Sequence, residues 1–228
     1  MHVLVTRPAE DGLQIATCLG GLGHVALLAP LLTPHFEAGP EPDFTGVQAI
    51  LVTSANGIRA LIRRTVRRDI PIFAVGPQTA QEAQAAGFTT IRNADGDARL
   101  LASAAARWTM PDKGILLHVC GAEAPGTLAT LLERAGFTVR RAVLYRVDAA
   151  ASLPDEARQA LEAGKLDAVL FFSPRSARVF CELAQGLPTQ MLTALCISPV
   201  TAQALTQTFK AVRIADKPNQ QALLALLN

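Results

Sequence analysis

The sequence holds few residues that could bind a metal or a nucleotide through a local motif. Its four cysteines show no Cys-x-x-Cys spacing and its four histidines form no closely spaced pair, which excludes the common zinc sites. No Gly-x-Gly-x-x-Gly follows the first apolar run and no P-loop motif occurs, which disfavours dinucleotides and P-loop nucleotides. We therefore expect no metal and no cofactor. Each cysteine is interpreted as a small core residue, and His118 as a core or strand-end residue.

Charge excess and long apolar runs are lacking too. The 21 Lys and Arg residues nearly balance 19 Asp and Glu residues, a net charge of +2, so no basic field predicts a nucleic-acid partner. No uninterrupted apolar run approaches the roughly 18 residues of a membrane helix, and no export signal follows Met1. With 50% hydrophobic residues the chain is too apolar for disorder. We expect a folded, cytoplasmic protein with no membrane partner.

What the sequence has is a regular alternation of short apolar runs with helical segments. Runs of this kind are typical of parallel strands covered on both faces. Glycines close three of the helical segments, at Gly23, Gly87 and Gly136. The pattern predicts an α/β fold. Ten strands are expected, at Val3–Thr6, Val25–Ala29, Ala49–Thr53, Ile72–Val75, Thr89–Arg92, Ile115–Val119, Val139–Arg146, Ala168–Phe172, Leu195–Ile197 and Val212–Ile214.

The chain also repeats itself. Residues 3–32 match residues 116–145 at one constant offset, and the stretch from Ala49 to Arg59 matches the stretch from Ala168 to Arg178. The order is short unit, long unit, short unit, long unit. One of each would make a five-stranded flavodoxin-like sheet, so the chain predicts two such domains. Tandem order would place residues 1–110 in one domain, whereas the alternative makes residues 40–140 an inserted domain. The stretches at 31–37 and 144–148 favour insertion, because each is longer than a sheet strand needs and each lies at a candidate boundary.

Ligands of open parallel sheets bind beyond the carboxyl ends of the strands, where helices begin. The residues that follow these strands are mostly small and hydroxylated, such as those at 53–57, 76–79, 172–176 and 198–201. One interpretation of these hydroxyls is helix N-capping. The second, compatible with the first, is an anion site built from N–H and O–H donors, and carboxylates are the ligands that we expect it to bind.

Few charged or aromatic groups accompany these donors. Arg7 follows the first strand and could bind an anion, whereas Arg59 and Arg178 are interpreted as solvated helix positions. The basic run from Arg63 to Arg68 lacks interleaved aromatic residues and reads as a solvated helix end. Tyr145, the only tyrosine, stands at a candidate domain boundary, where it either reaches an interdomain cleft or lies at a rim with its hydroxyl in water.

In the order and spacing of its motifs the chain resembles the uroporphyrinogen-III synthase family. The motifs that carry the resemblance are Val5–Pro8, Val52–Gly57, Val75–Ala80, Gly136–Tyr145, Phe172–Pro174 with Ser176, Pro199–Ala202 and Lys217-Pro218. The resemblance implies two α/β domains, the second inserted into the first and joined by a two-stranded linker. We then expect a discontinuous domain of residues 1–33 and 150–228, an inserted domain of residues 40–141, and linker strands at 34–39 and 142–149.

The resemblance also implies the reaction. Linear hydroxymethylbilane loses its terminal hydroxyl as water to give an azafulvene, the last pyrrole attacks through its substituted carbon to form a spiro intermediate, and reclosure delivers uroporphyrinogen III with ring D inverted. Because the substrate closes by itself to isomer I, the enzyme mainly imposes a fold on it. A cleft with a hinge would close around its eight carboxylates.

By matched motif, Tyr145 is carried over as the residue that aids departure of the hydroxyl, and Thr79 and Thr201 as hydroxyls facing the cleft. The remaining substrate-binding candidates are Arg7, Ser54, Asn56, Gly76, Ser173 and Ser176. Two positions depart from the family pattern: Cys120-Gly121 stands where Arg-Gly is frequent, and Ser198 where Gly is frequent. These departures put the substrate contacts of the first of these loops in doubt.

The expected partners are the substrate and, transiently, hydroxymethylbilane synthase, with the chain a monomer. Two other functions fit parts of the pattern. A noncatalytic two-domain binder of a small polyanionic ligand resembles periplasmic binding proteins, and the absence of an export signal argues against it. A sugar-nucleotide transferase with two Rossmann-like domains is weakened by the short chain and by the lack of a paired-acid or pyrophosphate-loop motif.

Overall fold

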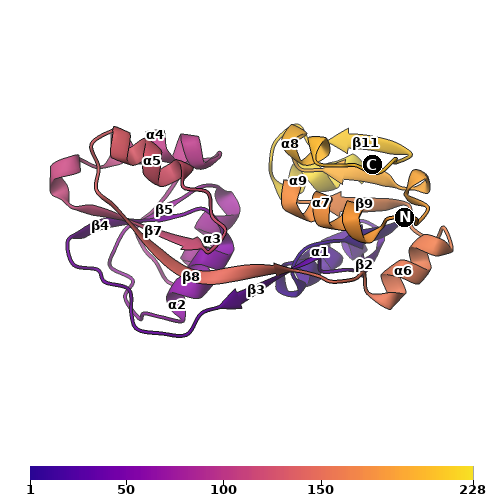
Figure 1. Ribbon diagram of the computed structural model, residues 1–228, viewed down its shortest axis with the longest axis horizontal. Coiled ribbons are helices and arrows are strands. Elements are labelled where there is room, and N and C mark those ends of the chain that lie inside the picture. Colours follow the sequence, from indigo (N-terminus) through magenta and orange to yellow (C-terminus); the bar gives the residue numbers. More distant parts are fainter. Residues whose placement is uncertain (228) are drawn as a thin grey trace. The chain divides into compact units, whose positions relative to one another are not determined.

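The computed structural model describes residues 1–227. The chain forms two compact units, one built from residues 1–33 together with the chain from residue 148 onward, and the other from residues 34–147 (Figure 1). We call them unit 1 and unit 2. Each is a mixed α/β structure with its own sheet, which confirms the predicted fold class. No helix among residues 1–227 combines the length and apolarity of a membrane span.

Unit 1 alternates strands and helices. Its elements are β1 (His2–Val5), α1 (Ala9–Gly21), β2 (Val25–Leu28), α6 (Asp155–Glu162), β9 (Ala168–Phe171), α7 (Pro174–Leu183), β10 (Thr193–Cys196), α8 (Pro199–Gln203), β11 (Ala211–Ile214) and α9 (Gln220–Leu224), with short 3-10 turns at Thr189–Met191 and Ala225–Leu227. The sheet order is β11-β10-β9-β1-β2, and every pair is parallel. Numbered along the unit, this is the flavodoxin order 2-1-3-4-5.

Both faces of this sheet are buried by helices. Leu4, Val169 and Phe171 pack with α6 and α7 on one face, whereas Val3 and Leu170 pack with α1 and α9 on the other. Successive strand residues point to opposite faces, so a strand covered on both sides is apolar at every position. This explains why the continuous apolar runs of the sequence predicted the strands correctly.

Unit 2 has the same layered construction. Its elements are β3 (Leu32–Phe36), β4 (Val47–Val52), α2 (Ala55–Ile62), β5 (Ile72–Ala74), α3 (Pro77–Ala85), β6 (Ile91–Asn93), α4 (Ala98–Trp108), a 3-10 turn (Pro111–Lys113), β7 (Ile115–Gly121), α5 (Thr127–Arg134) and β8 (Val139–Ala149). The sheet order is β3-β8-β7-β4-β5-β6. One core packs α2 and α3 on one face, and a second packs α4 and α5 on the other.

The sheet of unit 2 has the flavodoxin order in permuted form. The strands from β8 to β6 are parallel, and along the chain their order is 3-2-1-4-5. Starting the numbering at β7 instead turns it into 2-1-3-4-5, the order of unit 1. Unit 2 therefore has the long repeat first and the short repeat second, and unit 1 has the reverse.

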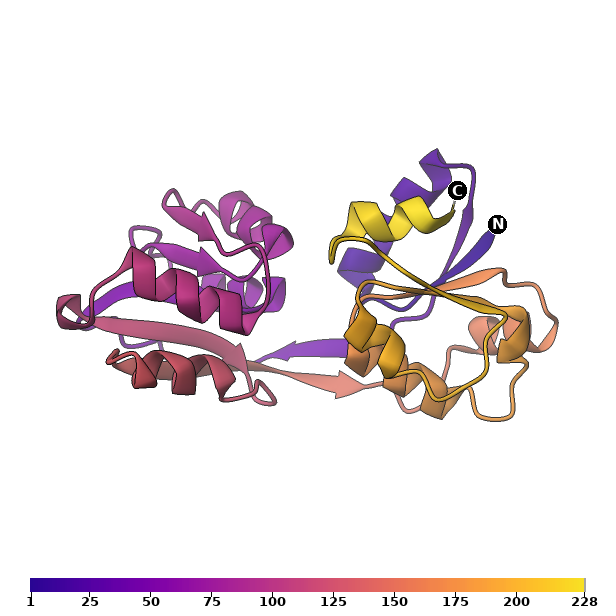
Figure 2. The same cartoon turned by 90° about the horizontal axis from the view of Figure 1, so that it is seen from above.

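Strands β3 and β8 carry both points at which the chain passes between the units (Figure 2). The N–H of Glu37 donates to the carbonyl of Leu144, and the N–H of Ala150 donates to the carbonyl of Leu31. The partner numbers rise along one strand as they fall along the other, so the pair is antiparallel. With β3 the structure has eleven strands within residues 1–227, not ten, because the stretch read as a linker joins the sheet of unit 2.

The local signals for helix ends are confirmed. Gly23, Gly87 and Gly136 follow α1, α3 and α5 with φ of 77°, 89° and 86°, a left-handed conformation that glycine adopts without a steric penalty. Ser54, Ser173 and Ser198 accept backbone hydrogen bonds at the starts of α2, α7 and α8, as the capping interpretation predicts.

Three interpretations of surface and core positions need correction. Cys18 is exposed on α1 and is not a core residue, although Cys120, Cys181 and Cys196 are buried. Arg59 is buried in α2 rather than solvated. The basic run after α2 needs only a partial correction: Arg63 and Arg67 are exposed, as a solvated helix end predicts, but the arginines also contact backbone carbonyls and rings.

His118 lies in the core of unit 2, on β7, with only 2% of its surface exposed. Among residues 1–227 neither of its ring nitrogens has a hydrogen-bond partner. Burial, and secondarily the charge of Arg141, lowers the pKa of His118 from its usual 6.5 to about 4. The folded chain therefore holds this imidazole neutral at pH values where an unfolded chain would protonate it.

We predict that the stability of unit 2 falls as pH decreases from about 6.5 to about 4. In this window the unfolded state binds a proton that the folded state does not, so the free energy of unfolding drops, by up to about 3 kcal/mol. Urea unfolding of the protein and of His118→Leu at several pH values measures this. The variant is expected to lose this part of the pH dependence, and an identical pH profile for both proteins would contradict the prediction.

Candidate active site

In each unit the sheet contains a switch point, where two neighbouring strands send their following helices to opposite faces. Ligands of such sheets bind beyond the strand ends at this place. In unit 1 it lies between β1 and β9, and in unit 2 between β7 and β4. The residues beyond these four strand ends include Arg7, Ser173, Gly121 and Ser54, three of which are sequence-predicted site residues.

Tyr145 reaches the switch point of unit 2 from β8. In the sheet, Tyr145 is paired with Gly121 at the end of β7. Its ring packs against that of Phe36, with 6.5 Å between the ring centroids. The side chain of Ser54, at the start of α2, and the backbone of Gly121 act on the phenol by lowering its pKa. Tyr145 is only 7% exposed, and it belongs to a core cluster of unit 2 together with Leu144.

Burial raises the pKa of Tyr145 above its ordinary value of 10, and the hydrogen bonds from Ser54 and Gly121 only partly oppose this effect. The cause is the cost of placing a phenolate in an apolar surrounding. The phenol therefore keeps its proton throughout the physiological pH range. The side chain is therefore a weak acid, and its packing against Phe36 fixes the orientation of the ring.

Gly121 is the residue that lets the phenol come this close. A Cβ at this position would lie 2.9 Å from Cε2 and 3.1 Å from Cζ of Tyr145, closer than carbon atoms normally approach. The ring and the end of β7 are thus packed at the contact limit. A glycine is required here for space rather than for backbone conformation.

The other candidates of unit 2 lie at the starts of α2 and α3. Asn56 follows the cap Ser54 by two residues, and its N–H donates to the Ser54 hydroxyl. Gly76 is the N-cap of α3 and has no side chain with which to close the helix start. Thr79, in the first turn of α3, is buried with 4% exposure. The structure thus places these three residues at the ends of two neighbouring strands, β4 and β5.

In unit 1, Arg7 spans the switch point. Its guanidinium lies 4.8 Å from the ring centre of Phe172, which follows β9, and it forms an ion pair with Asp11 in the first turn of α1. Thr6 donates from its hydroxyl to the carbonyl of Leu170. The cation of Arg7 is therefore fixed across the β1 and β9 ends, with its side chain 14% exposed.

The hydroxyl candidates of unit 1 occur as two similar pairs. Ser173 caps α7 and its hydroxyl donates to Ser176 across 3.1 Å, and Ser176 in turn donates to the Ser173 carbonyl. At α8, the hydroxyls of Ser198 and Thr201 lie 3.0 Å apart. Ser176 and Thr201 are buried, whereas Ser173 and Ser198 are partly exposed. In each pair, the more exposed hydroxyl thus belongs to the N-cap serine, Ser173 or Ser198.

Two arginine arrangements escaped the sequence analysis. Arg59 of α2 forms a 2.8 Å ion pair with Glu82 of α3. Beyond α2, Arg63 lies 4.0 Å from the ring centre of Phe36, while Arg67 and Arg68 stack on two other phenylalanines. Their partners are distant in sequence, so no local signal could have revealed them.

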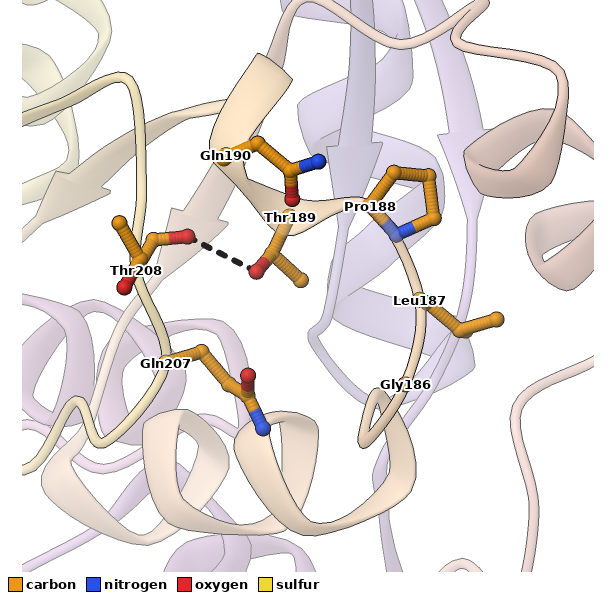
Figure 3. Close-up of a pocket in the computed structure, with 7 residues that line it drawn as sticks. All are labelled: Gly186, Leu187, Pro188, Thr189, Gln190, Gln207 and Thr208. Carbon is orange, nitrogen blue, oxygen red and sulfur yellow. Dashed lines mark hydrogen bonds between the residues drawn. The ribbon is translucent and has the colours of Figure 1, made fainter.

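A pocket of about 360 Å³ lies elsewhere, in unit 1. It is lined by residues 186–190 with Gln207 and Thr208, as Figure 3 shows. These residues precede β10 and β11, so they lie at the edge of the sheet opposite to the strand ends discussed above. Within residues 1–227 no cluster of three or more His, Cys, Asp or Glu side chains is placed to hold a metal ion.

Comparison with known proteins identifies the family. Residues 14–225 match the family described as Uroporphyrinogen-III synthase HemD. The chain belongs to the uroporphyrinogen-III synthase family. It is therefore an enzyme of tetrapyrrole biosynthesis, a cyclising hydro-lyase that converts hydroxymethylbilane into uroporphyrinogen III. This confirms the function expected from the resemblance, and nothing favours the noncatalytic alternative.

Solved structures agree on the fold. Uroporphyrinogen-III synthetase from Helicobacter pylori 26695 is similar over 99% of this chain and 97% of its own, with a TM-score of 0.68 and 21% identity. A mutant uroporphyrinogen III synthase from Thermus thermophilus is similar over 100% of this chain and 97% of its own, with a TM-score of 0.58 and 19% identity. The search of curated proteins gave no match.

The elevated pKa of Tyr145 can be measured directly because the chain has one tyrosine. We predict that absorbance at the phenolate wavelength rises at a higher pH in the native protein than in urea, because burial disfavours the charged form. The higher pKa of the folded state contributes to the free energy of unfolding. This contribution is complete below pH 10 and is lost as pH rises through the pKa of the native protein. Tyr145→Phe is the blank, and equal midpoints in both states would contradict the burial argument.

Gly121→Ala is predicted to displace the Tyr145 ring. The added methyl group cannot fit at 2.9 Å, so we expect a lower melting temperature and a tyrosine titration shifted toward the unfolded value. Gly126→Ala is the matched control, since it lies in the same loop with open space around its Cβ and a φ of −70°. Similar titrations for both variants would show that the contact does not hold the ring.

Proposed function

We propose that the strand-end donors of each unit bind the carboxylates of hydroxymethylbilane and that Tyr145 assists departure of its terminal hydroxyl. The observation that carries this proposal is the gathering of Tyr145, Ser54 and Gly121 at the switch point of unit 2, matched in unit 1 by Arg7 beside Phe172. Both are places where open α/β sheets bind ligands.

The donors suit a polyanionic substrate. Helix starts present unpaired N–H groups and the positive end of a dipole, and Ser54, Ser173 and Ser198 add hydroxyls. Gly76 leaves the start of α3 without a side-chain cap, which frees its N–H groups for a ligand. Arg7 adds one cation in unit 1. Such fixed donors need no reorganisation when the substrate binds.

The buried hydroxyls have a supporting role in this proposal. Thr201 is fully buried and its hydroxyl lies 3.0 Å from that of Ser198, and Thr79 and Ser176 are each 4% exposed. We propose that they orient the helix starts to which the carboxylates bind. Ser173 and Asn56, which are partly exposed, are the better placed of the candidates for direct contact.

The proposed chemistry at Tyr145 is proton donation. The terminal hydroxyl of the substrate leaves as water, so its oxygen must gain a proton while the pyrrole that stays behind loses its N–H proton and becomes the azafulvene. A phenol that keeps its proton at neutral pH can donate to this oxygen. The last pyrrole then attacks the azafulvene, and the closing geometry is imposed by the bound carboxylates.

The reaction is tested by generating hydroxymethylbilane in situ, adding the protein, oxidising the products and separating the isomer I and isomer III porphyrins. A product that shifts from isomer I, formed without the protein, to isomer III, formed with it, establishes the activity. Isomer I alone from folded protein would leave a noncatalytic binder of polyanions as the function.

Tyr145→Phe is predicted to lower kcat by about 10²-fold, the lower end of the effect of a positioned general acid. Because the substrate ionises readily, the variant should still yield isomer III slowly. The ring and its packing on Phe36 are kept, so the melting temperature should change little. Unchanged turnover would remove Tyr145 from the mechanism.

Three expectations belong to the same proposal: a monomer, a cytoplasmic location and a transient contact with hydroxymethylbilane synthase. The chemistry of the substrate supports the contact, since free hydroxymethylbilane closes to isomer I and direct transfer would limit this loss.

A further inference from the structure

An ion pair with both partners largely buried connects the two helices that begin at the candidate site of unit 2. Nη2 of Arg59 lies 2.8 Å from Oε2 of Glu82, with side chains 10% and 26% exposed. Nη1 of the same guanidinium donates to Oδ1 of Asn56 across 3.4 Å. One side chain thus contacts the first turn of its own helix, α2, and the neighbouring helix, α3.

The Arg59–Glu82 ion pair lies one helical turn from the candidate residues at the starts of α2 and α3. Arg59 lies one turn beyond Asn56, and Glu82 lies one turn beyond Thr79. The helix starts themselves hold Ser54, whose side chain lowers the pKa of Tyr145, and Gly76. The pair therefore fixes the spacing of two sets of N–H donors that stand at the ends of adjacent strands, β4 and β5.

A second contact extends from Arg59 toward Tyr145. The carbonyl of Arg59 accepts a 2.6 Å hydrogen bond from Arg63, whose guanidinium stacks on Phe36, and Phe36 packs against Tyr145. Removing one partner of a buried ion pair leaves the other charge without compensation, so the structure around it must rearrange.

We infer that Arg59 and Glu82 are positioning residues, which hold the starts of α2 and α3 at the spacing required to bind the substrate. This inference rests on the proposed binding of carboxylates at these helix starts. Arg59 does not itself bind the substrate, because its charge is directed to Glu82 and Asn56.

The direction in which Glu82→Ala changes KM distinguishes a positioning role of Arg59 from direct binding of the substrate. If Arg59 bound a substrate carboxylate, Glu82→Ala would release its cation and lower KM. If the pair positions the helices, Glu82→Ala raises KM. We expect an increase of about tenfold, the size of effect that a displacement of less than 1 Å produces, with a smaller change in kcat. Arg59→Lys, which keeps the charge but not the forked geometry, should raise KM as well.

The matched control is Gln48→Ala. Gln48 stands near the start of β4, at the opposite edge of the same sheet, where its amide donates to the carbonyls of Met110 and Gly114. Its loss should lower the melting temperature of unit 2 without altering KM. An unchanged or lower KM in folded Glu82→Ala, or an equal rise in Gln48→Ala, would overturn the inference. Glu82→Gln, which keeps an acceptor oxygen, replaces Glu82→Ala if that variant does not fold.

A measurement without substrate keeps this inference separate from the proposed function. In amide NMR spectra, Glu82→Ala should shift the N–H signals of Asn56 and Thr79 and leave that of Ser176, in unit 1, unchanged. Shifts without any isomer III from the wild-type protein would mean that the proposed function fails while the pair still sets the helix starts. Unshifted signals would overturn the positioning role.

Discussion

The handedness of the strand–helix–strand connection determines where the helices of each sheet diverge. In parallel sheets these connections are right-handed, so a helix covers one face or the other according to the direction in which the next strand is added. At β1 and β9 in unit 1, and at β7 and β4 in unit 2, that direction reverses. The helices diverge there, and strand ends and helix starts stay uncovered. Arg7, Ser54 and Ser173 follow the strands of the switch points, whereas the candidates Gly76, Thr79 and Thr201 follow the next strands outward, β5 and β10.

Such an edge must be polar but cannot hold many charges, because each charge loses hydration when a ligand covers it. The chain uses neutral donors for most of its candidate contacts. Ser54, Ser173 and Ser198 satisfy N–H groups of their own helices, and the hydroxyls of Ser173 and Ser198 also pair with those of Ser176 and Thr201. Two of the cations near these ends, Arg7 and Arg59, each face a carboxylate of their own unit.

The sequence was sufficient for what depends on neighbouring residues. Apolar runs located the strands, the glycines at 23, 87 and 136 located helix ends, and the serines located helix starts. It was insufficient where the partner is distant along the chain. Arg59 was read as solvated because nothing near it indicates Glu82, and the arginines after α2 lacked aromatic residues in sequence yet stack on Phe36, Phe44 and Phe88. The prediction that Cys18 is a core residue was wrong because α1 exposes that position.

The internal repeat shows how the two units came to differ at equivalent places. Position 7 after β1 corresponds to position 120 near the end of β7, by the same offset that relates Gly23 to Gly136. Unit 1 has Arg7 there, stacked on Phe172, and unit 2 has the buried Cys120. Tyr145 in turn corresponds to Leu32. Two sheets of one design thus present different chemistry at their switch points, a cation in unit 1 and a phenol in unit 2. Under the proposed function, the cation of Arg7 would serve the carboxylates of the substrate and the phenol of Tyr145 its reacting hydroxyl, so the two related sheets would take different parts in one reaction.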